Sequence, residues 1–206
     1  MNLFGQDHSI GIQGGVNLTN SSDSKSFQNS KFKTGIIGGL NYECLFKNNF
    51  SLGADLLYSQ QGFKYNNTTF QDVFGNVINF EPKFHYDYLQ LPIKFGYSVG
   101  LKLKGFAKIG LYPSILLKAE TTIPKVDSEG KFSGYEAIDV KDKVSKFDLG
   151  GLIELGADYG VYNNLKLFTS VTFRQSLTTF SNSAYFSESK MRHYGFALSL
   201  GLKYNL

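Results

Sequence analysis

Hydrophobic and polar residues alternate with a period of two along most of the chain. In residues 36–46 the even positions are mostly apolar, whereas the odd positions include Gly39, Asn41 and Glu43. Neighbouring side chains of a β-strand point to opposite faces, so this pattern predicts strands with one apolar face and one small or polar face. Such strands belong at a boundary between an apolar and a polar medium.

The alternation predicts eight strands in an all-β chain of 206 residues. They are expected at about residues 9–17, 34–46, 50–61, 84–98, 102–117, 145–159, 165–177 and 193–206. Short turns near residues 47–49, 99–101 and 160–164 alternate with long polar segments at 18–33, 62–83, 118–144 and 178–192. Short turns at one end and long loops at the other are typical of an outer-membrane β-barrel.

The small residues of the polar face indicate which side of the barrel is inside. Glycine and serine gather there, as at Gly53, Gly110, Gly156 and Ser199. The narrow lumen of an eight-stranded barrel needs small residues among a few large ones, whereas a face in water would carry more Lys and Glu. We therefore expect the apolar face to contact lipid. The alternative is a soluble, lipocalin-like ligand-binding barrel with the apolar face inside.

Hydropathy and charge do not oppose this prediction. The mean hydropathy is −0.18, and no apolar run approaches the roughly 20 residues of a membrane helix. A membrane β-barrel escapes such a profile because only alternate residues touch lipid. The net charge is +4, from 21 basic and 17 acidic residues that are scattered along the chain. This distribution argues against a nucleic-acid partner.

Aromatic residues make up 16% of the chain, with 19 Phe, 13 Tyr and no Trp. On the apolar face they lie towards the strand ends, which resembles the two interfacial girdles of membrane barrels. The predicted girdle consists of Phe46, Phe50, Tyr58, Tyr97, Phe147, Tyr159, Phe173, Tyr194 and Tyr204.

Eight charged residues are expected to point into the lumen, four of them acidic and four basic. They are Glu43, Asp55, Lys94, Lys108, Asp148, Glu154, Arg174 and Lys203. Buried charge is tolerated when it is paired, so this near-neutral set predicts an ion-pair network that fills the lumen together with Tyr86, Tyr88 and Tyr112. The alternative is a narrow channel or an ion or proton relay.

Candidates for catalysis are weak, and no cofactor is expected. His193 and Ser199 share the inner face of one strand. They are six residues apart, which is about 20 Å at the ~3.3 Å rise of a strand, so they cannot form a dyad. No metal-binding spacing, phosphate loop or nucleophile elbow is present. Cys44 is the only cysteine and can form no internal disulfide.

The segment Tyr88-Leu89-Gln90-Leu91-Pro92-Ile93 resembles the Y-L-x-[IL]-P-[IL] strand of an outer-membrane β-barrel domain family that includes the PorT-like barrels of secretion systems. The stretches 35–46, 56–62 and 195–204 are similar to other segments of that family. The resemblance implies an eight-stranded antiparallel up-and-down transmembrane β-barrel. Proline cannot donate to the ladder, so a bulge or a locally open pair is expected near Pro92.

Together these observations predict an N-terminal stub at residues 1–8, a possible remnant of a signal peptide, and a barrel at residues 9–206. An even strand count places both termini in the periplasm. The expected function is that of a non-enzymatic anchor or scaffold in outer-membrane lipid. By analogy with the family, it is expected to be an accessory subunit of an export or assembly machine. A protein partner would bind the long outer loops, chiefly residues 118–144, with Phe132 and Tyr135 as anchors.

Overall fold

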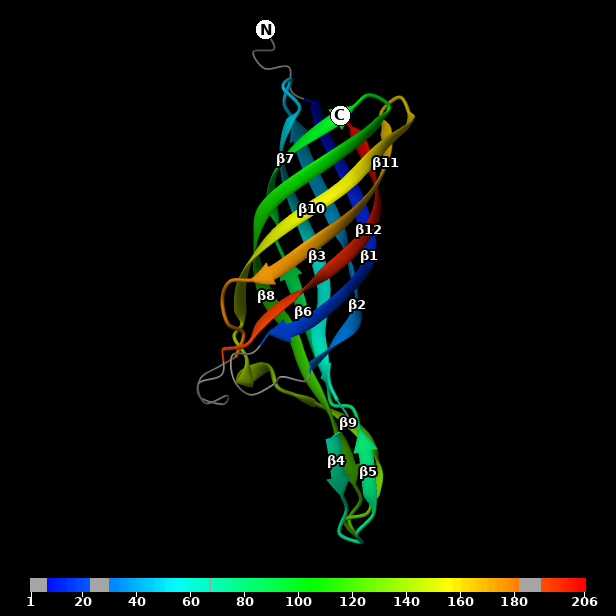
Figure 1. The fold of residues 1–206 in the computed structure, drawn as a ribbon, viewed down its shortest axis with the longest axis vertical. Helices are drawn as coiled ribbons and strands as arrows, with labels where there is room; N and C mark the ends of the chain where they lie inside the picture. Colours follow the sequence, from blue (N-terminus) through cyan, green and yellow to red (C-terminus); the bar gives the residue numbers. More distant parts are fainter. Residues whose placement is uncertain (1–6, 23–29, 67, 182–189) are drawn as a thin grey trace.

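The computed structural model describes residues 7–22, 30–66, 68–181 and 190–206. A large antiparallel sheet closes into a barrel, and a narrow extension at one end includes a separate two-stranded sheet (Figure 1). Each barrel strand pairs with its neighbours along the chain. β12 pairs with β1, and β8 pairs with β10, so the ladder returns to its start. No helix in the described residues is long and apolar enough to cross a bilayer.

Eight transmembrane strands form the wall, as the alternation predicted. Leu91 and Pro92 divide the fourth strand into β6 and β7. The strands are β1 (Asp7–Ser22), β2 (Ser30–Leu45), β3 (Phe50–Tyr65), β6 (Lys83–Gln90) with β7 (Ile93–Gly100), β8 (Leu103–Val126), β10 (Phe147–Tyr162), β11 (Leu165–Ser176) and β12 (Arg192–Asn205). Residues 1–6 of the expected stub and parts of the first and last long loops lie outside the described residues.

The apolar face points outward and the polar face inward. In β3, Leu52 and Leu56 are exposed, whereas Asp55 and Ser59, which point to the other face, are buried. The same inversion holds on the other strands, where Leu40 is 57% exposed in β2 and Leu198 is 54% exposed in β12. A wall that presents leucines outward is the arrangement of a membrane barrel and excludes the lipocalin-like alternative.

Aromatic rings cover glycines inside the barrel. Gly150 lies opposite Tyr112 across the β8–β10 pair, Gly156 lies opposite Phe106, and Gly201 lies opposite Phe168 across β11–β12. A Cβ atom built on any of the three glycines would collide with the facing ring. The small residues of the polar face therefore make room for large neighbours, which is how a narrow lumen is filled without voids.

The strand around Pro92 is locally open rather than bulged. The register against β3 and β8 is the same before and after Leu91–Pro92. The Pro92 carbonyl accepts a bond from the Asp55 amide at 2.9 Å, and the Leu91 amide donates to the Pro113 carbonyl at 2.9 Å. Each of these two pairs lacks the return bond, because neither Pro92 nor Pro113 has an amide to donate. The register shift between β6 and β8 lies instead at Asp87/Tyr88.

The long segments differ most from the sequence prediction. Residues 118–144 were expected to be a polar loop, but β8 runs on to Val126 and turns into β9 (Phe132–Asp139), followed by a short 3-10 turn η1 (Lys141–Lys143). Residues 62–83 contain the hairpin of β4 (Thr68–Gln71) and β5 (Val77–Phe80). The polar composition hid these hairpins because strands outside the membrane need no apolar face. Residues 68–82 and 119–139 project from the end of the barrel opposite the termini, and we call them the outer extension.

The outward-facing wall makes a direct prediction. Leu198→Arg or Leu40→Arg should destabilise the barrel by about 2–4 kcal/mol, because each places a cation at mid-barrel depth in hydrocarbon. Thr122→Arg, in the outer extension, is the control and should cost much less. Urea titrations of the protein folded into lipid vesicles measure all three. Equal costs at the three sites would contradict a membrane-embedded wall.

Candidate functional site

The lumen at the end near the termini holds a four-membered ion-pair cluster. Glu43 binds two lysines: Lys108 contacts its Oε1, and Lys203 Nζ lies 2.9 Å from its Oε2. Lys203 also lies 3.1 Å from Asp158 Oδ1. Asp158 was not among the eight predicted lumen charges, although its parity on β10 places it on the inner face. The rings of Phe106 and Phe168 lie beside the Lys203 ammonium group.

A second cluster lies further along the lumen. Lys94 Nζ is 2.7 Å from Asp55 Oδ2 and 2.9 Å from Glu154 Oε2, and all three side chains are almost fully buried. The Gln13 side-chain amide donates a further bond to Asp55 at 3.1 Å. One ammonium group thus bridges β3 and β10 from β7, across the barrel interior.

The remaining two predicted lumen charges do not join an ion pair. Arg174 donates to Gln90 Oε1 at 2.6 Å and lies over the ring of Tyr112. Asp148 accepts bonds from Ser176 and Thr178, each at 2.6 Å. Within the described residues neither has an oppositely charged partner within 4 Å, so neutral hydrogen-bonding groups satisfy both. Charged side chains in the lumen are therefore satisfied by hydroxyl and amide groups as well as by opposite charges.

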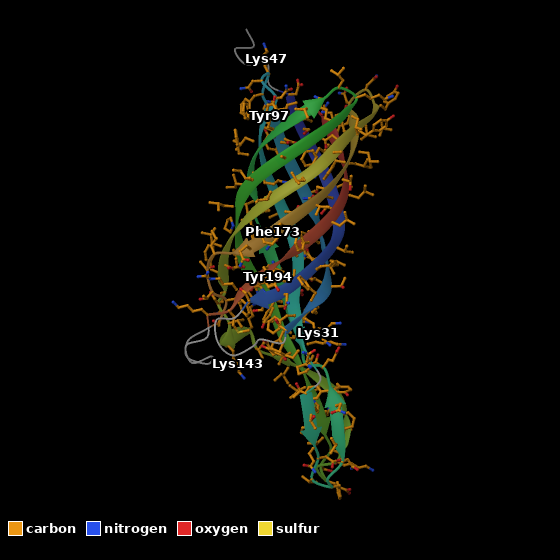
Figure 2. All side chains as sticks on the ribbon, in the orientation of Figure 1. Lys31, Lys47, Tyr97, Lys143, Phe173 and Tyr194 are labelled. Carbon is orange, nitrogen blue, oxygen red and sulfur yellow. The ribbon has the colours of Figure 1, made fainter. Side chains whose placement is uncertain are left out.

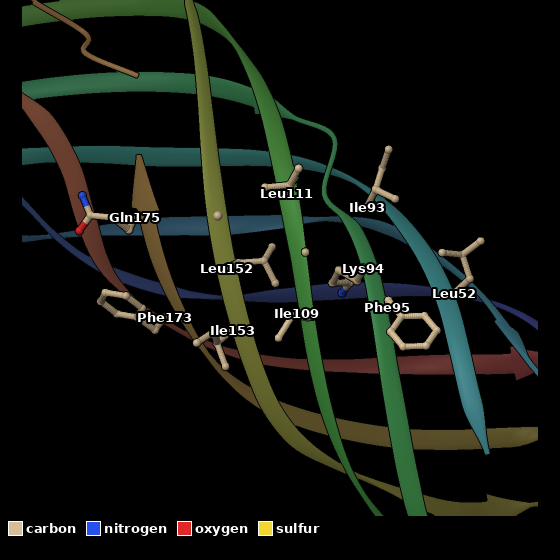
Figure 3. A pocket seen from close by; sticks show the side chains of 12 residues that line it. Leu52, Ile93, Lys94, Phe95, Ile109, Leu111, Leu152, Ile153, Phe173 and Gln175 are labelled. Carbon is tan, nitrogen blue, oxygen red and sulfur yellow. The ribbon is translucent and has the colours of Figure 1, made fainter. Parts of the chain in front are cut away.

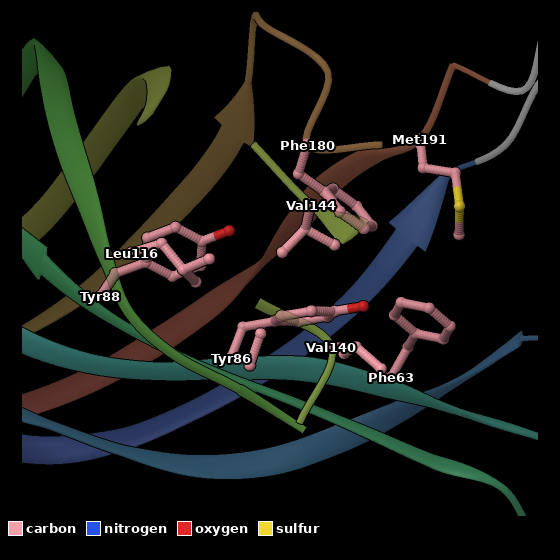
Figure 4. Close-up of a cluster of buried hydrophobic side chains, with 9 residues drawn as sticks. Phe63, Tyr86, Tyr88, Leu116, Val140, Val144, Phe180 and Met191 are labelled. Carbon is pink, nitrogen blue, oxygen red and sulfur yellow. The ribbon is translucent and has the colours of Figure 1, made fainter. Parts of the chain in front are cut away.

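An apolar plug closes the mouth of the barrel at the end opposite the termini, which we call the outer mouth (Figure 4). Val140 and Val144 enter from the segment after β9, and Phe180 and Met191 enter from the β11–β12 connection. Phe180 stacks on the ring of His193, with centroids 3.9 Å apart. Barrel side chains complete the cluster: Phe63, Tyr86, Tyr88, Leu116 and Ala119. His193 is thus an aromatic packing partner, and Ser199 does not share its surroundings.

The lumen is filled along its length. Two internal cavities, one beside the ion pairs and one beside Arg174 and His193, measure about 10 Å³ each. Such a space holds about one water molecule. The described residues therefore leave no continuous path of the width that diffusion of a solute requires. Nor do they bring together three or more His, Cys, Asp or Glu side chains that could hold a metal ion.

The larger hollows lie on the outside of the wall. One groove of about 650 Å³ crosses β7, β8 and β10, and side chains such as Phe95, Ile109 and Ile153 line it (Figure 3). It forms where Gly110 and Gly151 leave gaps between larger neighbours. A hollow in the apolar wall of a membrane barrel is a place for lipid chains.

Most of the nine predicted girdle residues lie within three positions of a strand end. Figure 2 labels three of them, Tyr97, Phe173 and Tyr194. Near the short turns are Phe46, Phe50, Tyr97, Tyr159 and Tyr204, and near the opposite end are Phe147, Phe173 and Tyr194; Tyr58 lies deeper on β3. Two of them, Phe50 and Tyr97, pack against each other with tilted rings whose centroids are 5.0 Å apart. Their action as interfacial anchors stays a prediction.

The two hairpins of the outer extension end in the same turn. Each turn has an aspartate, two residues and a glycine with positive φ: Asp72 with Gly75 (φ 85°) and Asp127 with Gly130 (φ 83°). In each, the aspartate Oδ1 accepts two backbone amides of its own turn at 2.8–3.0 Å. The D-x-x-G spacing is a turn signal that the sequence analysis passed over.

Asp72 also joins the two hairpin tips. Its Oδ2 accepts the Phe132 amide at 3.3 Å, and the Val73 amide donates to the Gly130 carbonyl at 3.4 Å. The Asn76 side-chain amide, 2.9 Å from Oδ2, is the main cause that holds the pKa of Asp72 below its ordinary value of 3.8. The backbone amides of Asn76, Phe132 and Phe74 act in the same direction.

The two predicted anchor residues lie together on this extension. The rings of Phe132 and Tyr135 meet edge to face with centroids 5.3 Å apart, and Phe80 of β5 lies 6.2 Å from Tyr135. Tyr135 is 54% exposed, whereas Phe132 is half-buried. The most exposed apolar side chains of the tip were not predicted: Val73 is 74% exposed and Phe74 is 60% exposed.

A closed antiparallel barrel with leucines outward and ion pairs inward is an outer-membrane β-barrel of bacteria. The chain belongs to the outer membrane protein beta-barrel domain family, whose model matches residues 4–182. Membership of the narrower PorT-like group is not part of that match. A search of curated proteins found no match.

Solved structures share the fold at low sequence identity. OprG from Pseudomonas aeruginosa is 11% identical with a TM-score of 0.52, and the match covers 96% of this chain and 95% of OprG. Neisserial surface protein A is 13% identical with a TM-score of 0.50, and the match covers 95% of this chain and 96% of that protein. These likenesses support the barrel fold and carry no activity over to this chain.

The shared lysine of the second cluster gives a stability prediction. Lys94→Met should destabilise the barrel by about 3–5 kcal/mol, because it leaves Asp55 and Glu154 buried without their cation. Arg174→Met is the matched control and should cost less, since no carboxylate loses its partner. Urea titration in vesicles gives both values. Recovery of stability on also replacing Asp55 and Glu154 with leucine would support the pairing, and equal costs for the two single variants would contradict it.

The hairpin tips give a pH prediction. The pKa of Asp72 is lower in the folded protein, so its contribution to order is complete above the unfolded value of 3.8 and is lost as the pH falls through the folded value. Amide exchange should therefore show the protection factors of Phe74, Asn76 and Phe132 falling in acid. Asp72→Ala should produce the same loss at neutral pH, whereas Asp127→Ala should affect only its own turn. Protection that is independent of both changes would exclude a tip held by Asp72.

Proposed function

We propose that this chain is a non-enzymatic membrane anchor that presents its outer extension to a protein partner outside the cell, with both termini in the periplasm. The observation that carries the proposal is the contrast between the two ends. The lumen is filled and the short-turn end has only tight connections, whereas the other end projects two folded hairpins. Recognition is more often found on such projections than on the scaffold below them.

The tip of the extension has the chemistry of a contact surface. Val73, Phe74 and Tyr135 expose apolar or aromatic area, although nothing in a hydrated setting favours that exposure. The Asp72 bonds hold the backbone beneath Val73 and Phe74, so the surface is pre-organised. Pre-organisation lowers the entropy cost of binding, and aromatic side chains dominate interface energetics.

The resemblance of the Tyr88–Ile93 segment to PorT-like barrels suggests an export or assembly machine as the setting for this partner. A narrow channel and an ion or proton relay have less support. Either would need water along the lumen, which the ion pairs and the apolar plug occupy. A stable, porin-like conductance of the unaltered protein in planar bilayers would favour the channel and remove the anchor proposal.

Substitutions at the tip test the partner. Phe74→Ser and Tyr135→Ser should leave the barrel folded, since neither residue contributes to the ladder of the wall, and should reduce the yield of a partner cross-linked and co-purified from native membranes. Leu101→Ser is the control, because Leu101 is 92% exposed at the opposite end. Loss of the same partner with Leu101→Ser, or no loss with the tip variants, would move the binding surface away from the extension.

A further inference from the structure

Three lysines form a row across adjacent strands at the base of the outer extension. Lys31 of β2 pairs in register with Lys64 of β3, and Lys64 pairs with Lys83 of β6. The β3–β6 register is unbroken down to Leu57↔Gln90, so Lys64 and Lys83 lie on the same outward face as Leu56 and Leu89. Figure 2 shows Lys31 at the level where the barrel passes into the extension.

The positive charge of this row is only partly balanced within the protein, because the nearby Asp87 and Glu120 pair with His85 and Lys118. Like charges directly opposite each other on neighbouring strands are destabilising. Glu81 contacts Lys31 at 3.4 Å, whereas Lys64 and Lys83 have no carboxylate within 4 Å among the described residues. A fourth lysine, Lys33, extends across Gly62, and its Nζ lies 2.7 Å from His85 Nδ1.

The row lies at the depth of lipid headgroups. Leu56 pairs with Leu40 at mid-barrel, and Lys64 is eight residues further along β3. At ~3.3 Å per residue and a strand tilt of about 35–45°, the row lies roughly 19–22 Å from the mid-plane. The hydrocarbon core ends about 15 Å from the mid-plane, and the headgroup region reaches about 20–22 Å.

An apolar groove of about 460 Å³ on β1, β2 and β3 is not part of this site. Its lining includes Leu40, Ala54 and Leu56, so it begins at mid-barrel and continues towards the short-turn end. The row itself, on the outward face at headgroup depth, matches the anionic head of a lipid.

We infer that Lys31, Lys64 and Lys83 bind the phosphate of an anionic lipid headgroup in the leaflet that surrounds the outer end of the barrel, with Lys33 at the edge of the site. Lysine binds phosphate as a point charge, and one phosphate monoester with two negative charges would neutralise the repulsion along the row. The inference requires the membrane-embedded wall but not a protein partner for the extension.

The test compares lipid binding by the folded protein and by Lys64→Gln/Lys83→Gln. Native mass spectrometry from a zwitterionic detergent measures retention of phosphatidic acid, phosphatidylcholine and inorganic phosphate. The unaltered protein should retain phosphatidic acid in preference to the other two, and the double variant should bind it about tenfold or more weakly. Lys47→Gln/Lys102→Gln removes the same charge at the short-turn end and should leave the preference unchanged.

Stability separates lipid binding from a structural role of the lysines. In phosphatidylcholine vesicles the double variant should be at least as stable as the unaltered protein, because it removes like-charge pairs. Adding phosphatidic acid should raise the unfolding midpoint of the unaltered protein and not that of the variant. An equal rise in both proteins, destabilisation of the variant in neutral vesicles, or equal retention of free phosphate and phosphatidic acid would each overturn the inference.

Discussion

The structure depends on one constraint: hydrocarbon around the wall offers no partner for a backbone amide or carbonyl. Every strand of the wall must therefore bond to a neighbour on both sides, and the pairing of β8 with β10 and of β12 with β1 meets that requirement. The ladder continues even where proline removes a donor, because the carbonyls of Pro92 and Pro113 still accept amides from adjacent strands. The missing bonds at this site are those that Pro92 and Pro113 cannot donate, and the amides of Asp55 and Leu91 keep their partners.

The same surroundings turn the usual distribution of side chains inside out. Leucines that would form a core in water cover the outside, and the interior must be completed with what the inner face supplies. In this barrel the inner face supplies lysines, each of which binds two carboxylates or shares one with another lysine. It also supplies aromatic rings that lie over glycines of the neighbouring strand. The larger of the two apolar clusters in the described residues lies at the outer mouth, where Phe180, Met191 and their neighbours separate the charged interior from water, and a small one of Ile37, Leu57 and Ala197 lies within the barrel. Ion pairs and aromatic rings thus fill the barrel interior, whereas apolar side chains form the plug.

Period-two alternation was enough to predict the eight strands, the outward face and the inward charges, because lipid imposes that period on every strand of the wall. The alternation no longer predicts structure beyond the membrane-spanning part of the chain. β9 and the β4–β5 hairpin lie in water, so their sequences carry no alternation, and only the turns at Asp72 and Asp127 mark them. The partners inside the lumen could not be predicted either, since parity assigns Arg174 and Asp148 to the interior without indicating that Gln90, Ser176 and Thr178 satisfy them. Phe180 and Met191 enter the plug from a loop whose composition gave no hint of it.

β8 is a single strand of 24 residues that begins at a short turn, crosses the membrane and continues into the outer extension (Figure 1). It is not interrupted by a loop, although its register against β6 shifts by one residue at Leu117, and strands flank it on both sides within the wall. The part of β8 in the extension is therefore continuous with a part that is hydrogen-bonded on both sides within the barrel. A pull on the tip of the extension loads the hydrogen bonds of the part within the barrel along the strand axis, in shear, where many must break together before the strand slides. Traction on the extension would therefore be carried along β8 to the short-turn end of the barrel.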